Sequence, residues 1–470
     1  KFGDKVAEKD RDDFVSELTA YGAYLLSDVP SEGMQLWSFP VYQSHTIDSI
    51  LQFILSDPRV EYVEPDYPIS LRAMTNDPFM SELWGLQNTG QLGGKDDAPY
   101  RGYFDPSVGI NGADIGVERA WEMTTGSREV IVAVFDTGID LQHQDLAENI
   151  WVNEGEIPGN GIDDDLNGYV DDIHGWSYCS NSGDVFDDES HGTHVSGTIG
   201  ALGGNGIGIV GVSPNVKIMT LKILGGARGC EMPNGFFIDV KRALKYAADN
   251  GATIMNHSWG GQPGAAKQRT INDGIRYTQS RGLLFVHAAG NDDRLDTDKT
   301  SVDYWDADFP SVISVAATDR RDRLTSFSNF GRETVDLGAP GAGIYSTIPN
   351  GRYDYKPGTS MASPHVAGAA ALIKAYRPSW NYAQIKAALM NGVDPIADLF
   401  NRSVSGGRLN IGRSLSALIP LWLAVDSNAS GSIAPGEAVD LSFSVSAVDL
   451  PTGKHNAALE LTFSVNEGFA

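Results

Sequence analysis

Between residues 125 and 295 the chain alternates short aliphatic runs with longer amphipathic runs. Residues 130–135, 217–224 and 283–286 are typical of buried strands, and residues 237–250 and 267–279 between them have the apolar spacing of helices. Strands that are apolar on both faces belong to a parallel sheet that helices cover on both sides. The expected fold class is therefore α/β, a three-layer sandwich with a mainly parallel central sheet.

Polar residues stand where three of these strands end. Asp136 directly follows the first strand, Ser258 ends a further strand, and Asn291 follows the last one. In a parallel α/β sheet, functional side chains gather beyond the carboxyl ends of the strands. We therefore expect these three residues to lie near one another.

Three glycine-bearing runs carry an aspartate, a histidine and a serine in that order. Asp136 lies in Val-Phe-Asp-Thr-Gly, His191 begins His-Gly-Thr-His-Val-Ser-Gly, and Ser360 lies in Gly-Thr-Ser-Met-Ala-Ser-Pro-His. A serine hydroxyl is a weak nucleophile that needs a base within hydrogen-bond reach. A histidine supplies that base and later the acid, and an aspartate fixes its tautomer. The pattern predicts a nucleophilic triad.

These three runs resemble the motifs of the subtilisin-like serine peptidases (subtilases), over about residues 75–415. The resemblance implies that Asp136, His191 and Ser360 form the triad. It also implies that the Asn291 side chain and the Ser360 backbone N–H stabilise the oxyanion. The substrate-binding residues that it implies are Ser258, Trp259 and Gly260, with Leu224 and Gly225 on the opposite wall. Trp259 is larger than the family's usual residue, so no side-chain preference follows.

An acidic run at residues 160–172 is a candidate calcium loop. Asp163, Asp165 and Asn167 stand at alternate positions, which resembles the first half of an EF-hand-type loop. The distant glutamate of such a loop is missing, so other loops must complete the site. The candidate ligands are Asp163, Asp165, Asn167, Tyr169, Asp171 and Asp172. A plain acidic, solvated loop stays open as the alternative.

The resemblance implies a second calcium site. Its expected side-chain ligands are Asp145, Asn205 and Asp77, and its expected carbonyl ligands are Leu202, Ile207 and Ile209. We therefore expect Ca²⁺ as a structural metal at one or more sites.

The chain is expected to contain three regions. Residues 1–73 resemble a subtilase propeptide, which acts as an intramolecular chaperone and inhibitor and would be cut off near Met74. Residues 74–416 form the catalytic domain, and residues 417–470 have the alternating pattern of a partial β-sandwich-like module.

Composition narrows the partners and the compartment. The net charge of −26 argues against nucleic acid or an anionic membrane as partner. No apolar stretch reaches about 18 residues, so no membrane span is expected. The chain begins at Lys1 without an apolar signal region, which suggests that a targeting segment has been removed. We expect a secreted monomer that acts on protein substrates. Cys179 and Cys230 form either one disulfide or two free thiols.

Two other functions compete with a serine endopeptidase. Asp136-Thr137-Gly138 is also the signature of aspartic peptidases, but those enzymes need two such carboxylates, and no second Asp-Thr-Gly or Asp-Ser-Gly occurs. The other alternative is a non-enzymatic binding protein on a retired subtilase scaffold.

Overall fold

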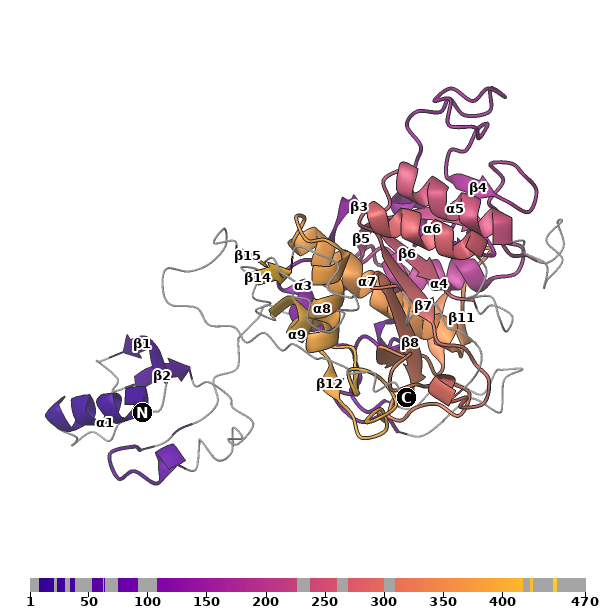
Figure 1. Cartoon of the computed structure of the whole chain (residues 1–470). Coiled ribbons are helices and arrows are strands. Elements are labelled where there is room, and N and C mark those ends of the chain that lie inside the picture. Colours follow the sequence, from indigo (N-terminus) through magenta and orange to yellow (C-terminus); the bar gives the residue numbers. More distant parts are fainter. Residues whose placement is uncertain are drawn as a thin grey trace, which may run out of the picture. The chain divides into compact units, whose positions relative to one another are not determined.

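The computed structural model divides the chain into two compact units, residues 1–71 and 72–470 (Figure 1). It describes residues 8–20, 23–29, 34–38, 53–61, 63, 75–91, 108–225, 237–259, 269–299, 309–416, 423–425 and 443–445.

The first unit has its own small hydrophobic core. Helix α1 (Glu8–Ala20) precedes the antiparallel strands β1 (Tyr24–Val29) and β2 (Met34–Ser38). Phe14 and Leu18 lie one turn apart on α1 and therefore share a face. They are buried together with Ala23 and Ile54. The role of this unit as a propeptide stays a prediction.

The second unit is built on a nine-stranded sheet in the order β12-β13-β9-β8-β7-β6-β3-β5-β4. All neighbouring strands are parallel except β12 and β13, which are antiparallel. The strands are β3 (Gly126–Asp136), β4 (Gly175–Ser177), β5 (Asn215–Lys222), β6 (Ile254–His257), β7 (Leu284–Ala288), β8 (Val312–Thr318), β9 (Leu337–Pro340), β12 (Asp394–Pro395) and β13 (Gly407–Arg408).

Helices cover both faces of this sheet (Figure 1). The α-helices of the second unit are α3 (Val117–Trp121), α4 (His191–Gly200), α5 (Phe237–Asp249), α6 (Arg269–Ser280), α7 (Thr359–Tyr376), α8 (Tyr382–Asn391) and α9 (Ile411–Ser416). Short 3-10 turns are η2 (Met80–Glu82), η3 (Ala147–Asn149) and η5 (Thr297–Lys299). The hairpin of β10 (Ile344–Ile348) and β11 (Arg352–Lys356) leads into α7. The expected three-layer α/β sandwich is confirmed.

Central strand β3 shows how the two faces are filled. Val132 and Val134 belong to the core that packs against α4 and α7. Ala133 and Phe135, on the opposite face of the strand, belong to the core that packs against α5 and α6. Because side chains alternate along a strand, a continuously apolar strand is buried on both sides.

Beyond residue 416 the structure describes one antiparallel strand pair, β14 (Leu423–Val425) with β15 (Phe443–Val445). Both strands lie in the region whose alternating pattern predicts a partial β-sandwich-like module, and the rest of that region lies outside the described residues. Cys179 is disulfide-bonded, whereas Cys230 lies outside the described residues.

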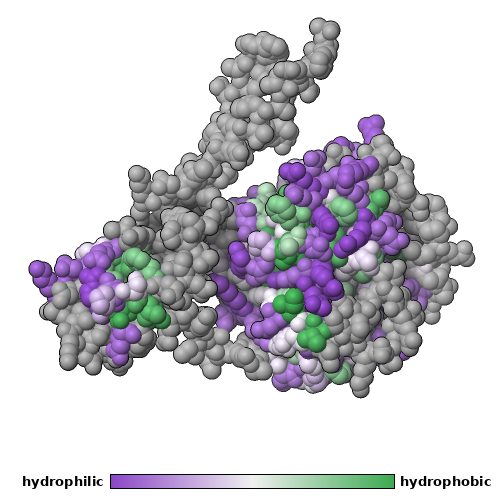
Figure 2. Space-filling view, turned by 90° about the horizontal axis from the view of Figure 1, so that it is seen from below, coloured by the Kyte–Doolittle hydropathy of each residue, from purple (hydrophilic) through white to green (hydrophobic). Residues whose placement is uncertain are grey.

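On the face drawn in Figure 2, polar side chains cover most of the coloured surface and hydrophobic ones form small patches. Among the described residues, no helix has both the length and the apolar character that a membrane crossing needs.

Candidate active site

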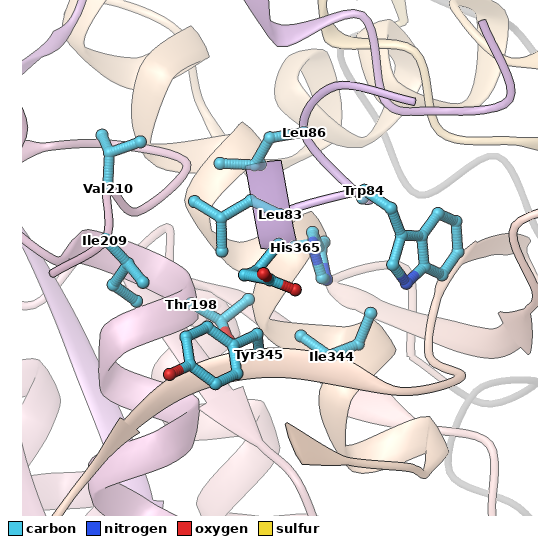
Figure 3. Close-up of a pocket in the computed structure, with 11 residues that line it drawn as sticks. Leu83, Trp84, Leu86, Thr198, Ile209, Val210, Ile344, Tyr345 and His365 are labelled. Atoms are coloured by element: carbon cyan, nitrogen blue, oxygen red, sulfur yellow. The ribbon is translucent and has the colours of Figure 1, made fainter. Parts of the chain in front are cut away.

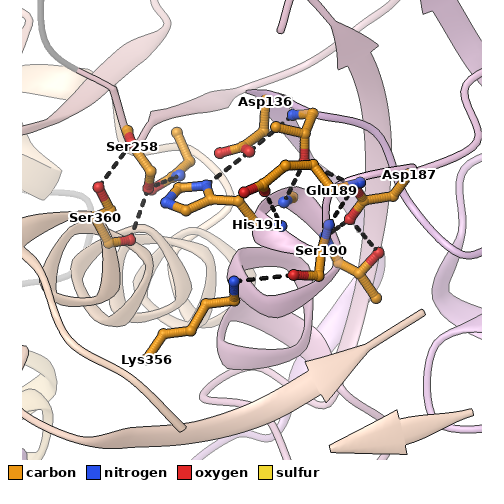
Figure 4. Close-up of polar contacts among 12 residues, drawn as sticks. Asp136, Asp187, Glu189, Ser190, His191, Ser258, Lys356 and Ser360 are labelled. Carbon is orange, nitrogen blue, oxygen red and sulfur yellow. Dashed lines mark hydrogen bonds and ion pairs between the residues drawn. The ribbon is translucent and has the colours of Figure 1, made fainter. Parts of the chain in front are cut away.

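The site is centred on a histidine–aspartate pair at the carboxyl end of the sheet. Strand β3 ends at Asp136 and helix α4 begins at His191. The His191 Nδ1 atom lies 2.8 Å from Asp136 Oδ1 (Figure 4), with 25% of the His191 side chain exposed and 1% of the Asp136 side chain. Asp136 Oδ1 also accepts the Thr137 N–H at 2.8 Å. The carboxylate is therefore held against the imidazole nitrogen that faces away from solvent.

The pair stabilises the charged form of the imidazole. Burial lowers the pKa of His191, but the charge and hydrogen bond of Asp136 outweigh burial, so the pKa lies above its ordinary value. A raised pKa makes His191 a stronger base for a hydroxyl proton.

Asp187 organises the loop that carries His191 into place. Its Oδ1 accepts the Thr137 hydroxyl and the Ser190 N–H at 2.8 Å each, and its Oδ2 accepts the Thr193 N–H and hydroxyl at 2.8 and 2.6 Å. Burial raises the pKa of Asp187, but these hydrogen bonds outweigh it and lower the pKa. Ser190, the residue before the histidine, has a left-handed backbone with φ of 95°. Asp187 therefore holds the turn at Ser190 in place and links it to Thr137, the residue after Asp136.

Ser360 lies in the first turn of α7, after Gly358 with φ of 146°. The Ser360 hydroxyl donates to the Ser258 carbonyl oxygen at 2.8 Å rather than to His191. Figure 4 shows the His191 ring between Asp136 on one side and Ser258 and Ser360 on the other. Hydroxyl contacts of this kind are often loose before substrate binds.

Ser258 compensates for a proline inside α7. Pro364 has no N–H, so the Ser360 carbonyl four residues earlier lacks its helical donor. The Ser258 hydroxyl fills that place at 2.9 Å, and it lies 2.8 Å from the Ser363 hydroxyl. Ser258, which directly follows β6, therefore ties this strand to the helix that presents Ser360.

Asn291 is oriented as an amide donor. Its Oδ1 accepts the Thr359 N–H at 3.0 Å and the Thr359 hydroxyl at 3.1 Å. The Nδ2 group has no acceptor among the described residues, which leaves it for a ligand beside Ser360, and the residue is exposed. Gly290 before it has φ of 102°, and a Cβ there would lie 2.5 Å from Asn329 Nδ2, so this turn requires glycine.

The other expected substrate-binding residues surround this centre. The Leu224 N–H donates to the Asp136 carbonyl oxygen at 3.2 Å, and Gly225 is buried. Trp259 packs against the core beneath α5 and α6, with its ring edge-on to His257 at 5.8 Å. Gly260 lies outside the described residues.

The residues of the second expected calcium site do come together. Asp145 is fully buried, and its carboxylate accepts Asn205 Nδ2, the Ile209 N–H and the Tyr353 hydroxyl at 2.8–2.9 Å. Among the described residues, the carbonyl oxygens of Leu202, Ile207 and Ile209 accept no hydrogen bond.

Asp77 completes this group from the segment before the catalytic core. It is 4% exposed, its Oδ2 accepts the Gly204 N–H at 2.9 Å, and its buried Oδ1 has no partner in the part of the chain that the structure describes. Burial and, less strongly, the charge of Asp145 raise its pKa. Two buried carboxylates beside free carbonyl oxygens fit a hard cation such as Ca²⁺.

The acidic run at 160–172 is arranged differently from the alternate-position expectation. Asp163 accepts the backbone amides of Asn167 and Gly168, and Asp171 accepts those of Asn160 and Gly161. Asp165 and Asp172 are joined by Glu156, and oxygens of the three lie within 4.8 Å of one another. Asn167 Nδ2 donates to both Asp165 and Asp172 at 3.0 Å, and the Tyr169 hydroxyl accepts from Tyr178 at 3.3 Å.

Glu156 and Asp187 are functional candidates that no sequence motif predicted. Glu156 precedes the acidic run, and its buried carboxylate accepts backbone amides of Asp164, Asp165 and Asp171. Nothing in its local sequence marks it. Asp187 stands four residues before His191 among other acidic residues, so only its burial distinguishes it.

An apolar cavity lies apart from the triad, and Leu83, Trp84, Ile209, Ile344, Tyr345 and His365 are among the residues that line it (Figure 3). His365 is buried, and its Nδ1 lies 2.8 Å from the Met361 carbonyl oxygen. Burial lowers the pKa of His365 to about 4. This histidine is therefore neutral at neutral pH.

Comparisons with known proteins agree with this geometry. A family model described as the subtilase family matches residues 127–410. A thermophilic serine proteinase of a Bacillus species is 32% identical over 370 residues, which cover 78% of this chain and 76% of that protein. Subtilisin-like protease 1 of Plasmodium berghei is 36% identical over 315 residues, and this chain spans about half of its length (51%).

Among solved structures, a protease from Pseudoalteromonas arctica matches with a TM-score of 0.53 and 26% identity, covering 73% of this chain and 98% of that one. The aspartic-peptidase alternative is wrong, because the carboxylate of Asp136 faces an imidazole and the relatives are serine peptidases.

Proposed function

This chain belongs to the subtilase family of serine endopeptidases, and from that premise we propose that Asp136, His191 and Ser360 hydrolyse peptide bonds through an acyl-enzyme. The observation that carries the proposal is the 2.8 Å Asp136–His191 contact beside the first turn of α7, where Ser360 lies. Serine, histidine and aspartate have this relation in nucleophilic triads on unrelated folds.

The residues divide the reaction between them. Ser360 Oγ attacks the scissile carbonyl carbon while His191 Nε2 takes the hydroxyl proton. The Asn291 amide and the Ser360 N–H stabilise the resulting oxyanion. His191 then gives its proton to the leaving amine as the C–N bond breaks. A water molecule, deprotonated by His191, hydrolyses the acyl-enzyme and restores Ser360.

Covalent labelling tests the nucleophile. A fluorophosphonate should add to the wild type once, at Ser360, and abolish hydrolysis of unfolded casein. The Ser360→Ala variant should take no label and lose hydrolysis. Ser280→Ala, an exposed serine on α6, should behave as the wild type. Labelling at another residue, or casein hydrolysis by Ser360→Ala, would contradict the assignment.

We also propose that residues 1–73 are a propeptide that the enzyme removes near Met74, and that the mature enzyme is secreted. The separation of residues 1–71 as a compact unit supports this. Intact mass should show the loss of roughly the first seventy residues in the wild type and none in Ser360→Ala. Equal processing of both proteins would assign the cut to another peptidase.

Calcium is proposed as a structural ion in two places. Asp77, Asp145 and Asn205, with the carbonyl oxygens of Leu202, Ile207 and Ile209, would hold one ion. Glu156, Asp165 and Asp172 would hold another. The buried, unpartnered Asp77 Oδ1 supports the first site, and the convergence of three carboxylates supports the second. In both places a bound ion would neutralise carboxylate repulsion and tie loops together.

A further inference from the structure

Lys356 places an ammonium group beside the catalytic histidine. It is the last residue of β11 and stands four residues before Ser360. It is partly buried, and its Nζ donates to the Ser190 hydroxyl at 2.9 Å (Figure 4). Because Ser190 directly precedes His191, the positive charge lies close to the catalytic residues.

This ammonium differs from the other lysines that the structure describes in the second unit. Five of these seven others face an aspartate: Lys222, Lys241, Lys245, Lys299 and Lys386. Lys217 and Lys374 donate to two carbonyl oxygens each. Lys356 contacts a neutral hydroxyl and no carboxylate within 4 Å among the described residues. An ammonium has three donors, so two remain for a ligand.

The chemistry of the reaction tells which part of a substrate meets Lys356. His191 must hand a proton to the leaving amine, so the residue after the scissile bond lies on the His191 side of Ser360. Ser258 lies on the other side, where its carbonyl contacts the Ser360 hydroxyl. In the view of Figure 4, His191 lies between Ser258 and Lys356. Lys356 therefore borders the leaving-group side.

The charge of Lys356 affects the pKa of His191. Burial and the Asp136 charge are the largest influences on the pKa of His191, and among the smaller ones Lys356 lowers it while Glu189 raises it. Glu189 is exposed, and its carboxylate accepts the His191 N–H at 2.9 Å. His194, the other titratable group nearby, is buried, and burial lowers its pKa, so it stays neutral.

We propose that Lys356 is a specificity-determining residue that binds the carboxylate of an aspartate or glutamate on the leaving-group side of the scissile bond. This inference rests on the proposed function. A partly buried, otherwise unpaired ammonium should prefer an acidic over a basic side chain by about tenfold in kcat/KM. The preference should weaken as salt rises, since the site is open to solvent.

Matched peptides test the preference. The peptides are built around a bond that the wild type cuts in unfolded casein, with Glu, Gln or Lys at the first or second position after it. The wild type should favour Glu over Lys. Lys356→Gln should bring the ratio close to one, Lys356→Glu should invert it, and Lys356→Arg should keep it. Lys245→Gln on α5, which removes one charge elsewhere, should leave it unchanged.

The outcomes separate this inference from its premise. If Lys356→Gln slows all three peptides equally and keeps the ratio, Lys356 only braces Ser190, and the inference is overturned while the enzyme assignment stands. A wild type that cleaves neither casein nor any peptide after removal of its first unit would overturn the proposed function and this inference with it. Thermal unfolding of each variant confirms that a changed ratio comes from a folded protein.

Discussion

Asp187 and Asp77 are both buried carboxylates of the second unit, but their surroundings shift their pKa values in opposite directions. Asp187 accepts hydrogen bonds at both oxygens from the loop around His191, and these lower its pKa. Asp77 keeps one buried oxygen without a partner, and burial, aided by the charge of Asp145, raises its pKa. In the catalytic corner, formed by Asp136, His191 and the loop of Asp187, hydrogen bonds of the chain compensate the buried charge of Asp187. In the Asp77–Asp145 pocket we propose that a cation does so.

The largest effect is expected for Asp136, the carboxylate that contacts the catalytic histidine. Asp136→Asn keeps the shape of the side chain but removes the charge that orients and stabilises His191, so kcat should fall about 10⁴-fold. Thermal stability should change little. Steady-state kinetics on a peptide, with Asp184→Asn on the exposed part of the preceding loop as control, checks this. A loss below tenfold would show that Asp136 does not serve His191.

Replacing Asp187 should lower the stability of the fold as well as kcat. Asp187→Asn turns an amide N–H₂ toward donors such as the Thr193 N–H and removes a charge that several donors share. We expect a loss of about 2–4 kcal/mol in the free energy of unfolding and a lower kcat, because Ser190 and His191 lose their anchor. Denaturant unfolding in the Ser360→Ala background measures the first without self-digestion. Unchanged stability would mean that the loop is fixed by other contacts.

The sequence predicted residues at the ends of elements better than it predicted their buried partners, for a physical reason. Asp136 ends β3, His191 begins α4, Asn291 follows β7 and Ser360 lies in the first turn of α7, so local motifs mark them, and the parallel sheet brings such ends together. Their partners carry no such mark. Asp187 acts because it is buried against residues of the Asp136 motif, and burial is a property of the fold.

The acidic run shows where spacing alone is insufficient. Alternate positions predicted that Asp163 and Asp165 would point at one ion, yet Asp163 turns to backbone amides while Asp165 meets Glu156 and Asp172. Short polar side chains in turns readily bond to the backbone two to five residues on. Which carboxylate is used in this way depends on turn geometry that spacing does not encode.

The next largest effect is expected from metal removal, which should destabilise the protein through the proposed calcium sites. In Ser360→Ala protein, a calcium chelator should lower Tm, since an ion present at 100 times its Kd contributes about 2.7 kcal/mol. Asp77→Asn should remove most of this chelator effect, and Glu156→Gln should remove the part that belongs to the acidic run. Asp184→Asn should keep the full effect. A Tm that chelator does not move would show that neither group of carboxylates holds calcium.

The smallest expected effect is the pH dependence of stability. It is also the most specific, because its sign differs between Asp77 and Asp187. The pKa of Asp77 is raised in the folded state, so without metal its contribution to stability is present below its ordinary pKa of 3.8 and is lost as pH rises through the folded value. In chelator, Asp77→Asn should therefore be more stable than its parent at neutral pH, and this advantage should vanish in acid. Calcium should reverse the order, since the ion needs the ionised carboxylate.

Asp187 should give the opposite slope, because its pKa is lowered and its contribution is lost only as pH falls below 3.8. Unfolding curves of both variants and their parent between neutral and acid pH, with chelator throughout, test the pair together. If Asp77→Asn is the less stable protein at neutral pH without metal, the Asp77 carboxylate is already compensated by the chain, and the contrast between the pocket and the catalytic corner fails.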